Sequence, residues 1–256
     1  MRLQVLTADS LSSIAGAADA TLHSMAKPRT PKPAVFDDPN YLTGVIDLLG
    51  VLCYGEISAC ERLAEDAKMA PDLKTKVEIV AMATAEFGHF IKLRDRLVEL
   101  DVDPYEAMKP FTTTFERFHK KTTPADYLEG LVKAYVGDGL ASDFYREIAA
   151  YLDANTRELV LDTLSGTGHS EFVVEQVRGA IRENPRVGGR LALWARRLMG
   201  EALSQAQTVI AEHDALSSVL VGSVDRPGMD LAGIGRMFAR ITEAHTKRMD
   251  KLGLAA

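Results

Sequence analysis

Hydrophobic positions recur with helical spacing along most of the chain, and no stretch alternates between apolar and polar residues as a half-buried strand does. A first helix is predicted over about residues 40–68 and a second over about 72–100. Pro71 and Asp72 lie at the junction, and both are typical of the start of a helix. Because the connection is short, these two helices are expected to form an antiparallel hairpin.

A second hairpin is predicted further along the chain. One helix is expected over about 125–152 and another over about 156–182, with the tight connection Asp153-Ala154-Asn155 between them. The segment 101–124 that separates the hairpins is rich in proline and threonine and is too long for a hairpin loop, so it suits a crossover along the bundle, with a short helix near 111–119. The pattern therefore predicts an all-α four-helix bundle.

The ends of the chain extend this bundle. A fifth helix is predicted over about 187–220 and a sixth over about 230–252. The N-terminal residues include Lys27-Pro28-Arg29-Thr30-Pro31-Lys32-Pro33, in which the prolines prevent a continuous helix. We therefore expect three parts: a flexible arm over 1–38, a helical bundle domain with the fifth helix over 39–222, and a C-terminal helix over 223–256.

Composition places the chain among soluble globular proteins. Of its 256 residues, 46% are hydrophobic and 26% are charged, and the sequence has neither an 18-residue apolar run nor the apolar stretch of a signal peptide. We expect a cytoplasmic protein with no membrane partner. Its two cysteines, Cys53 and Cys60, are seven residues apart on one predicted helix. That spacing is roughly 10 Å, too long for a disulfide, which agrees with a reducing compartment.

Five polar residues interrupt the apolar faces of the four bundle helices. A buried carboxylate without a partner is costly, so these residues require something that neutralises them. Glu86 and His89 are three residues apart on one helix, so that a carboxylate and an imidazole can bind one metal ion. Taken alone, this pair is more typical of a solvated Glu beside a hydrogen-bonded His. The full set favours a metal site: Glu56, Glu86, His89, Asp138 and His169.

The segments around these residues resemble the ferritin-like non-haem di-iron proteins. They are Tyr54-Gly55-Glu56-Ile57-Ser58-Ala59, Ala85-Glu86-Phe87-Gly88-His89-Phe90, Asp138-Gly139-Leu140-Ala141-Ser142-Asp143-Phe144 and Gly168-His169-Ser170-Glu171. Among these proteins the chain most resembles the bacterial tRNA hydroxylases that oxidise the isopentenyl group of 2-methylthio-isopentenyladenosine, over about residues 40–185.

The resemblance implies a ferritin-like four-helix bundle with extra C-terminal helices and an iron cofactor. It also implies an oxygen-activating monooxygenase that hydroxylates an unactivated C–H bond, with tRNA as substrate and an external electron donor. By the same resemblance, Glu56 is a terminal ligand of one iron, Glu86 bridges two irons and His89 is the nitrogen ligand of the first. Asp138, where the family has Glu, and His169 are then ligands of the second iron.

One position departs from the family pattern. Gly166 stands three residues before His169, where the family has a second bridging Glu. With Glu86 shared, each metal would keep three protein ligands, which still suits non-haem iron and dioxygen. Because a missing bridge weakens the second metal, two ions, one ion or none remain open. A ferroxidase-type metal-handling protein and a metal-free interaction module are the alternative functions.

A cluster of arginines follows the fourth predicted helix. Arginine forks pair with phosphates, so the cluster is a candidate RNA-facing surface; the alternative is a solvated helix face with ion pairs to Glu175 and Glu201. The net charge of −6 argues against general nucleic-acid binding but does not exclude a local basic face. The sequence is also compatible with an oligomer. The cluster consists of Arg178, Arg182, Arg186, Arg190, Arg196 and Arg197.

Overall fold

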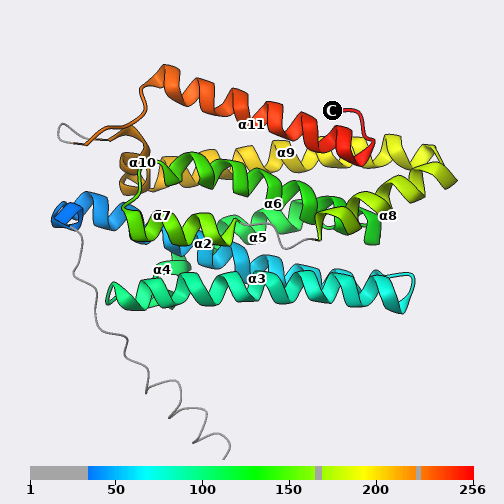
Figure 1. Cartoon of the computed structure of the whole chain (residues 1–256), viewed down its shortest axis with the longest axis horizontal. Coiled ribbons are helices and arrows are strands. Elements are labelled where there is room, and N and C mark those ends of the chain that lie inside the picture. Colours follow the sequence, from blue (N-terminus) through cyan, green and yellow to red (C-terminus); the bar gives the residue numbers. More distant parts are fainter. Residues whose placement is uncertain (1–33, 165–168, 223–225) are drawn as a thin grey trace, which may run out of the picture. The chain divides into compact units, whose positions relative to one another are not determined.

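The computed structural model describes residues 34–164, 169–222 and 226–256, and the elements of these residues are helices (Figure 1). The expected all-α fold is confirmed for this part of the chain. Most of the arm expected over 1–38 and the departure at Gly166 lie outside the described residues. The described part begins with the short 3-10 helix η1 (Ala34–Asp37), in which Phe36 is buried and stacks on Tyr41.

The first hairpin consists of α2 (Pro39–Asp66) and α3 (Leu73–Glu99), joined through η2 (Ala67–Met69). The side chain of Asp38 accepts hydrogen bonds from the first backbone N–H groups of α2, and Asp72 accepts one from Thr75 N at the start of α3. These aspartates satisfy N–H groups that no helical carbonyl can reach, and they fix where each helix begins. The expected hairpin is confirmed.

The crossover runs through α4 (Pro104–Met108), η3 (Lys109–Phe111) and α5 (Thr112–Lys121), which confirms the expected short helix. Both α4 and α5 pack on α2. Gly50 of α2 makes the contact with α4 close: a Cβ at this position would collide with the backbone carbonyl of Ala107. The long connection is therefore packed as part of the bundle.

The second hairpin is formed by α6 (Tyr127–Ala149), α7 (Ala154–Thr163) and α8 (Ser170–Glu183). The prediction of one continuous helix over 156–182 was wrong, because α7 ends at Thr163 and α8 begins at Ser170. The four residues Ser165-Gly166-Thr167-Gly168 lie outside the described part of the chain. The start of α8 matters for function because His169 directly precedes it.

Three further helices extend the bundle: α9 (Arg186–Glu212), α10 (Asp214–Val221) and α11 (Leu231–Leu252). The single helix predicted over 187–220 was also wrong, since the backbone leaves the helical region at His213. The His213 ring stacks on Phe111 at 4.5 Å, and its Nδ1 lies 3.5 Å from Asp47 Oδ2. These tertiary contacts outweigh local helix propensity and allow α10 to fold back onto α2.

The outer helices are held to α6 and to one another by specific contacts. The indole of Trp194 on α9 donates to the carbonyl of Glu129 at 2.9 Å. Arg178 on α8 donates to the carbonyls of Asp250 and Lys251 at the end of α11. The layer formed by α9 and α11 therefore covers α6 on the side away from α3 (Figure 1).

Helix α2 is long and apolar. By length and composition the segment Pro39–Met69 could cross a membrane, but half of its most apolar window is buried inside the protein. Leu48, Leu49 and Leu52 lie in the core, and α2 packs on α3, α4 and α10. Many of its apolar residues thus pack inside the helical bundle. Cys53 and Cys60 of this helix are free thiols, as expected.

Replacing Gly50 with Ala should destabilise the bundle, because the added methyl group has no room against α4. Overpacking of this kind costs about 1–3 kcal/mol, measurable by urea denaturation. Gly189→Ala is the matched control: this helical glycine has open space where a methyl group would lie, so Ala should add about 0.5–1 kcal/mol. Equal shifts for the two variants would contradict this description of the α2–α4 contact.

Candidate metal centre

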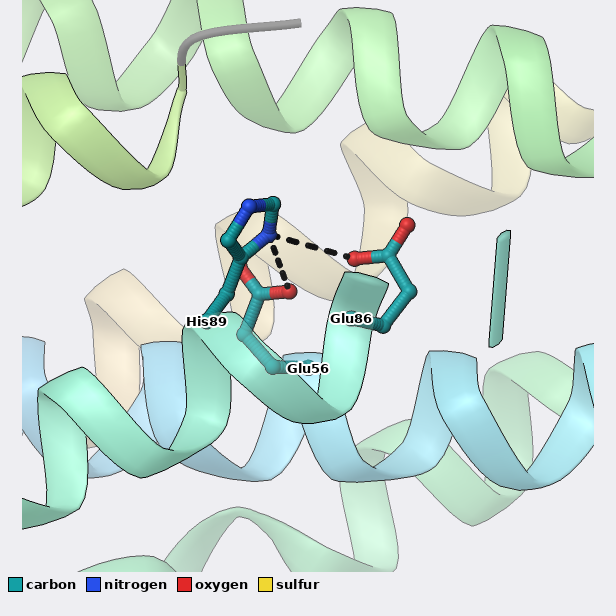
Figure 2. Close-up of side chains that lie close together, drawn as sticks. All are labelled: Glu56, Glu86 and His89. Atoms are coloured by element: carbon teal, nitrogen blue, oxygen red, sulfur yellow. Dashed lines mark ion pairs between the residues drawn. The ribbon is translucent and has the colours of Figure 1, made fainter. Parts of the chain in front are cut away.

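Glu56, Glu86 and His89 form a compact group between α2 and α3 (Figure 2). Nδ1 of His89 lies 3.5 Å from Oε2 of Glu56 and 3.7 Å from Oε2 of Glu86. One ligand atom from each of the three residues lies within 4.8 Å of the others. The helical spacing of Glu86 and His89 places both side chains toward Glu56 on the neighbouring helix.

The three side chains are largely buried, with exposed fractions of 14% for Glu56, 17% for Glu86 and 14% for His89. Burial and the neighbouring Glu86 raise the pKa of Glu56 to about 8. Burial also acts to raise the pKa of Glu86, but hydrogen bonding to His89 and Glu56 outweighs it and lowers that pKa. The two carboxylates, with burial opposing them, raise the pKa of His89 to about 10.

These shifts describe what neutralises the group in the absence of metal. The raised pKa values of His89 and Glu56 favour the protonated forms of both groups, which compensates the buried negative charge. Two carboxylates and an imidazole are also a donor set for a divalent transition metal. A cation can replace both protons at a point that all three residues reach. The residues present therefore fit one metal ion.

Asp138 on α6 faces the same space. Its side chain is exposed in area, but it lines an internal cavity, and desolvation followed by the charge of Glu86 raises its pKa to about 6. Its exposed surface therefore faces the cavity. Asp138 is close enough to Glu86 for charge interaction, but among the described residues it is not part of the compact group with Glu56 and His89.

His169 lies at the N-terminal end of α8 and also lines this cavity. Its Nδ1 is 4.0 Å from Oε2 of Glu78 on α3, and its charge lowers the pKa of Glu86. The structure thus brings Asp138 and His169 to the cavity that Glu56 and Glu86 also line, without assembling all five residues into one compact set. The half of the candidate centre on α2 and α3 is the more complete half.

The cavity has a volume of about 330 Å³ and is lined by residues of α2, α3, α5, α6, α8, α9, α10 and α11. Glu56, Glu86, Asp138 and His169 are in its wall, together with many aliphatic and aromatic side chains. Tyr145 also lines it, and burial followed by the charge of Glu56 raises the pKa of this phenol. The candidate metal ligands therefore open onto a mostly apolar chamber.

Arg248 is a residue of this region that the sequence pattern did not identify. It reaches from α11 over Gly139, donates to Asp143 Oδ2 at 2.6 Å, and its charge acts to lower the pKa of Asp138. A side chain at Gly139 would collide with it. No local signal indicates this role, because more than 100 residues separate Arg248 from Asp143 along the chain.

Several of the clustered arginines are engaged within the protein. Arg178 binds the carbonyls at the end of α11, Arg190 pairs with Asp126 and Glu129, and Arg196 donates to the carbonyl of Ala255. Arg197 lies 6.0 Å from the centre of the Trp194 ring. Arg182 and Arg186 have exposed side chains. Glu201, an expected partner of the cluster, binds Lys121 instead.

Replacing Asp138 with Asn should stabilise the metal-free protein at pH 7. The pKa of Asp138 is raised in the folded protein to about 6, so ionisation of this carboxyl group lowers the stability of the fold. The loss is absent below the pKa that the group has in the unfolded chain, and it grows as the pH rises toward about 6. Asn removes this penalty, a gain of about 1 kcal/mol after allowing for screening of an exposed side chain. Thermal unfolding at pH 5 and pH 7 measures it, and the gain should be larger at pH 7.

Asp143→Asn on the same helix is the control with the opposite sign. This change leaves the half-buried guanidinium of Arg248 without its carboxylate partner and should lower stability. A stabilised Asp143→Asn variant, or an Asp138→Asn gain that does not depend on pH, would contradict the electrostatic description of this wall.

Comparison with known proteins identifies the fold. No curated protein matches the chain. The family described as "Ferritin-like domain, actinomycetes" matches residues 39–223, which include the two hairpins, the crossover and helices α9 and α10. This match confirms the ferritin-like bundle that the sequence predicted, and it spans most of the chain. The protein therefore belongs to this family of ferritin-like domains.

Proposed function

We propose that this protein is a non-haem iron protein that activates dioxygen and hydroxylates a C–H bond of an apolar substrate. The observation that carries the proposal is the compact donor set Glu56, Glu86 and His89, of which Glu56 and Glu86 lie in the wall of a mostly apolar cavity. A ferritin-like bundle is a common scaffold for carboxylate and histidine ligands of this kind.

Glu56, Glu86 and His89 would hold the first iron, and Glu86, Asp138 and His169 would hold a second. When bound, iron supplies the redox chemistry of a monooxygenase, in which substrate, dioxygen, two electrons and two protons give the hydroxylated product and water. An external reductase provides the two electrons. The second site lacks a carboxylate at Gly166, so we expect its affinity for iron to be the lower of the two.

The side chains of this protein have three tasks in the proposal. Glu56 and His89 release their protons when a cation is bound, so that iron binding is linked to proton release. The aliphatic wall binds the apolar substrate and excludes bulk water. Arg248 and Asp143 hold α11 against α6 and restrict the position of Asp138.

The tRNA hydroxylases remain the candidate for a specific activity. An apolar chamber suits an isopentenyl group. Arg178, Arg190 and Arg196 are engaged by groups of the protein itself, so Arg182 and Arg186, which are also exposed, are the better candidates for RNA contact. Loss of hydroxylated isopentenyl-adenosine from tRNA after deletion of the gene would assign this substrate. An unchanged modification profile would reject it.

Iron analysis tests the proposed centre. Protein from iron-replete cells should contain at least one iron per chain, and Glu86→Gln and His89→Ala should each weaken binding at least tenfold in competition with a chelator, because each removes a ligand. Asp95→Asn is the control, since this carboxylate is exposed on the same helix and pairs with Arg94.

The three outcomes separate the functions. Iron together with oxygen-dependent hydroxylation supports the proposal, and iron that is oxidised without any organic product favours the ferroxidase-type alternative. Wild-type protein that binds no iron would reject both and leave a metal-free interaction module.

A further inference from the structure

A second group of buried polar residues lies in the wall of the same cavity, outside the candidate metal centre. Lys133 on α6 is 7% exposed and Asp66 at the end of α2 is 9% exposed. Nζ of Lys133 donates to the carbonyl of Thr122 at 2.8 Å. Gly130 lies one turn before Lys133, and a side chain at this position would collide with the carboxylate of Asp66. The two charges are therefore built into the interior from different helices.

Other polar atoms of this wall have no partner. The side chain of Gln205 on α9 is only 8% exposed, and its Oε1 accepts no hydrogen bond within the described part of the chain. Nε2 of His119 on α5 lies 2.6 Å from the hydroxyl oxygen of Ser58, while Nδ1 of the same ring has no hydrogen-bonding partner among the described residues. A buried polar atom left unsatisfied costs about 1–3 kcal/mol. Both residues line the cavity and add hydrogen-bonding side chains to its wall, although these two atoms themselves have almost no accessible surface.

The charges of this polar wall, which we define as Asp66, His119, Lys133 and Gln205, balance one another. Lys133 and Asp66 carry opposite charges, and their mutual attraction opposes the effect of burial on each pKa. Burial and the charge of Lys133 lower the pKa of His119 to about 3, so this imidazole is neutral. The nearby guanidinium of Arg62 is paired with Glu61 and Glu65. The opposite charges of Lys133 and Asp66 leave this wall without excess charge to compensate a charged ligand.

The rest of the lining is apolar and connects the polar wall with the candidate metal centre. Leu52, Leu140 and Phe144 line the same cavity as Glu56 and Asp138. Its volume of about 330 Å³ is that of a small-molecule site rather than of a packing defect. An occupant thus meets a long apolar surface with one neutral group of hydrogen-bonding partners.

We propose that this cavity binds an uncharged, elongated apolar alcohol, with its hydroxyl at the polar wall and its hydrocarbon part extending past Glu56 and Asp138. A hydroxyl both donates and accepts, so it can donate to the carboxylate of Asp66 or accept from the ammonium group of Lys133, both of which line the cavity. That this alcohol is also the molecule that becomes hydroxylated rests on the function proposed above.

The test uses the full chain without metal and three probes with the same ten-carbon chain: 1-decanol, decanoate and decylamine. Calorimetric titration at pH 7 should give saturable binding of one decanol per chain, at least tenfold tighter than binding of either charged probe. Absence of saturable decanol binding would overturn the proposal. Equal affinity for a charged probe would also overturn it, because the polar wall would then not select a neutral group.

Variants locate the binding site. Ala206 on α9 lines the cavity, so Ala206→Phe should fill it and weaken decanol binding at least tenfold while the protein stays folded. Gln205→Leu removes one hydrogen-bonding partner and should weaken decanol binding by about tenfold. Gln207→Leu, an exposed position on the same helix, is the control and should have no effect. If both cavity variants bind decanol like the wild type, the proposed site is wrong.

This experiment is independent of iron. Decanol binding without any iron binding would reject the proposed oxygenase and leave the ligand site, whereas iron binding without decanol binding would reject only the ligand site. The two proposals can therefore fail separately.

Discussion

The electrostatic cost of placing carboxylates inside a helical bundle is the constraint on which the rest of this structure depends. Glu56 and Glu86 face each other across α2 and α3, where burial disfavours their charged forms. His89 lies between them and carries the compensating positive charge when no metal is bound. Apolar residues at these positions would avoid this cost, so the polar group is a candidate functional site.

The packing of the remaining helices follows from keeping space open beside this group. The crossover helix α5 and the outer helix α9 form the far wall of the cavity, and α11 supports α6 through Arg248 and Asp143. Close contacts at Gly44 and Gly50 fix α10 and α4 against α2. The bundle is thus tightly packed at its ends and around α2, and the cavity separates α2 from α6 and α9 near the candidate metal centre.

Much of this arrangement could be predicted from the sequence because its signals are local. Aspartates 38, 72, 126, 153 and 230 accept hydrogen bonds from the first N–H groups of their helices, and the short connections determine the two hairpins. The spacing of Glu86 and His89 predicted two ligands on one helix face. Glu56 was found because it interrupts an apolar stripe at a position that faces the neighbouring helix.

The parts that could not be predicted depend on contacts between distant segments. The end of α9 at His213 requires Phe111 and Asp47, and the position of Arg248 requires Asp143 and Gly139. The polar wall of the cavity combines residues from α2, α5, α6 and α9, none of which carries a local motif. The number of arginines in the cluster likewise did not predict that Arg178 and Arg190 bind groups on other helices.

The central claim is that Glu56, Glu86 and His89 bind iron at the edge of an apolar cavity. Diffraction data collected above and below the iron absorption edge, on crystals grown with ferrous iron under anaerobic conditions, test it most directly. The account predicts an anomalous peak within bonding distance of all three side chains, with any second peak weaker and nearer Asp138 and His169. Crystals with iron elsewhere, or with His89 still held only by the two carboxylates, would contradict it.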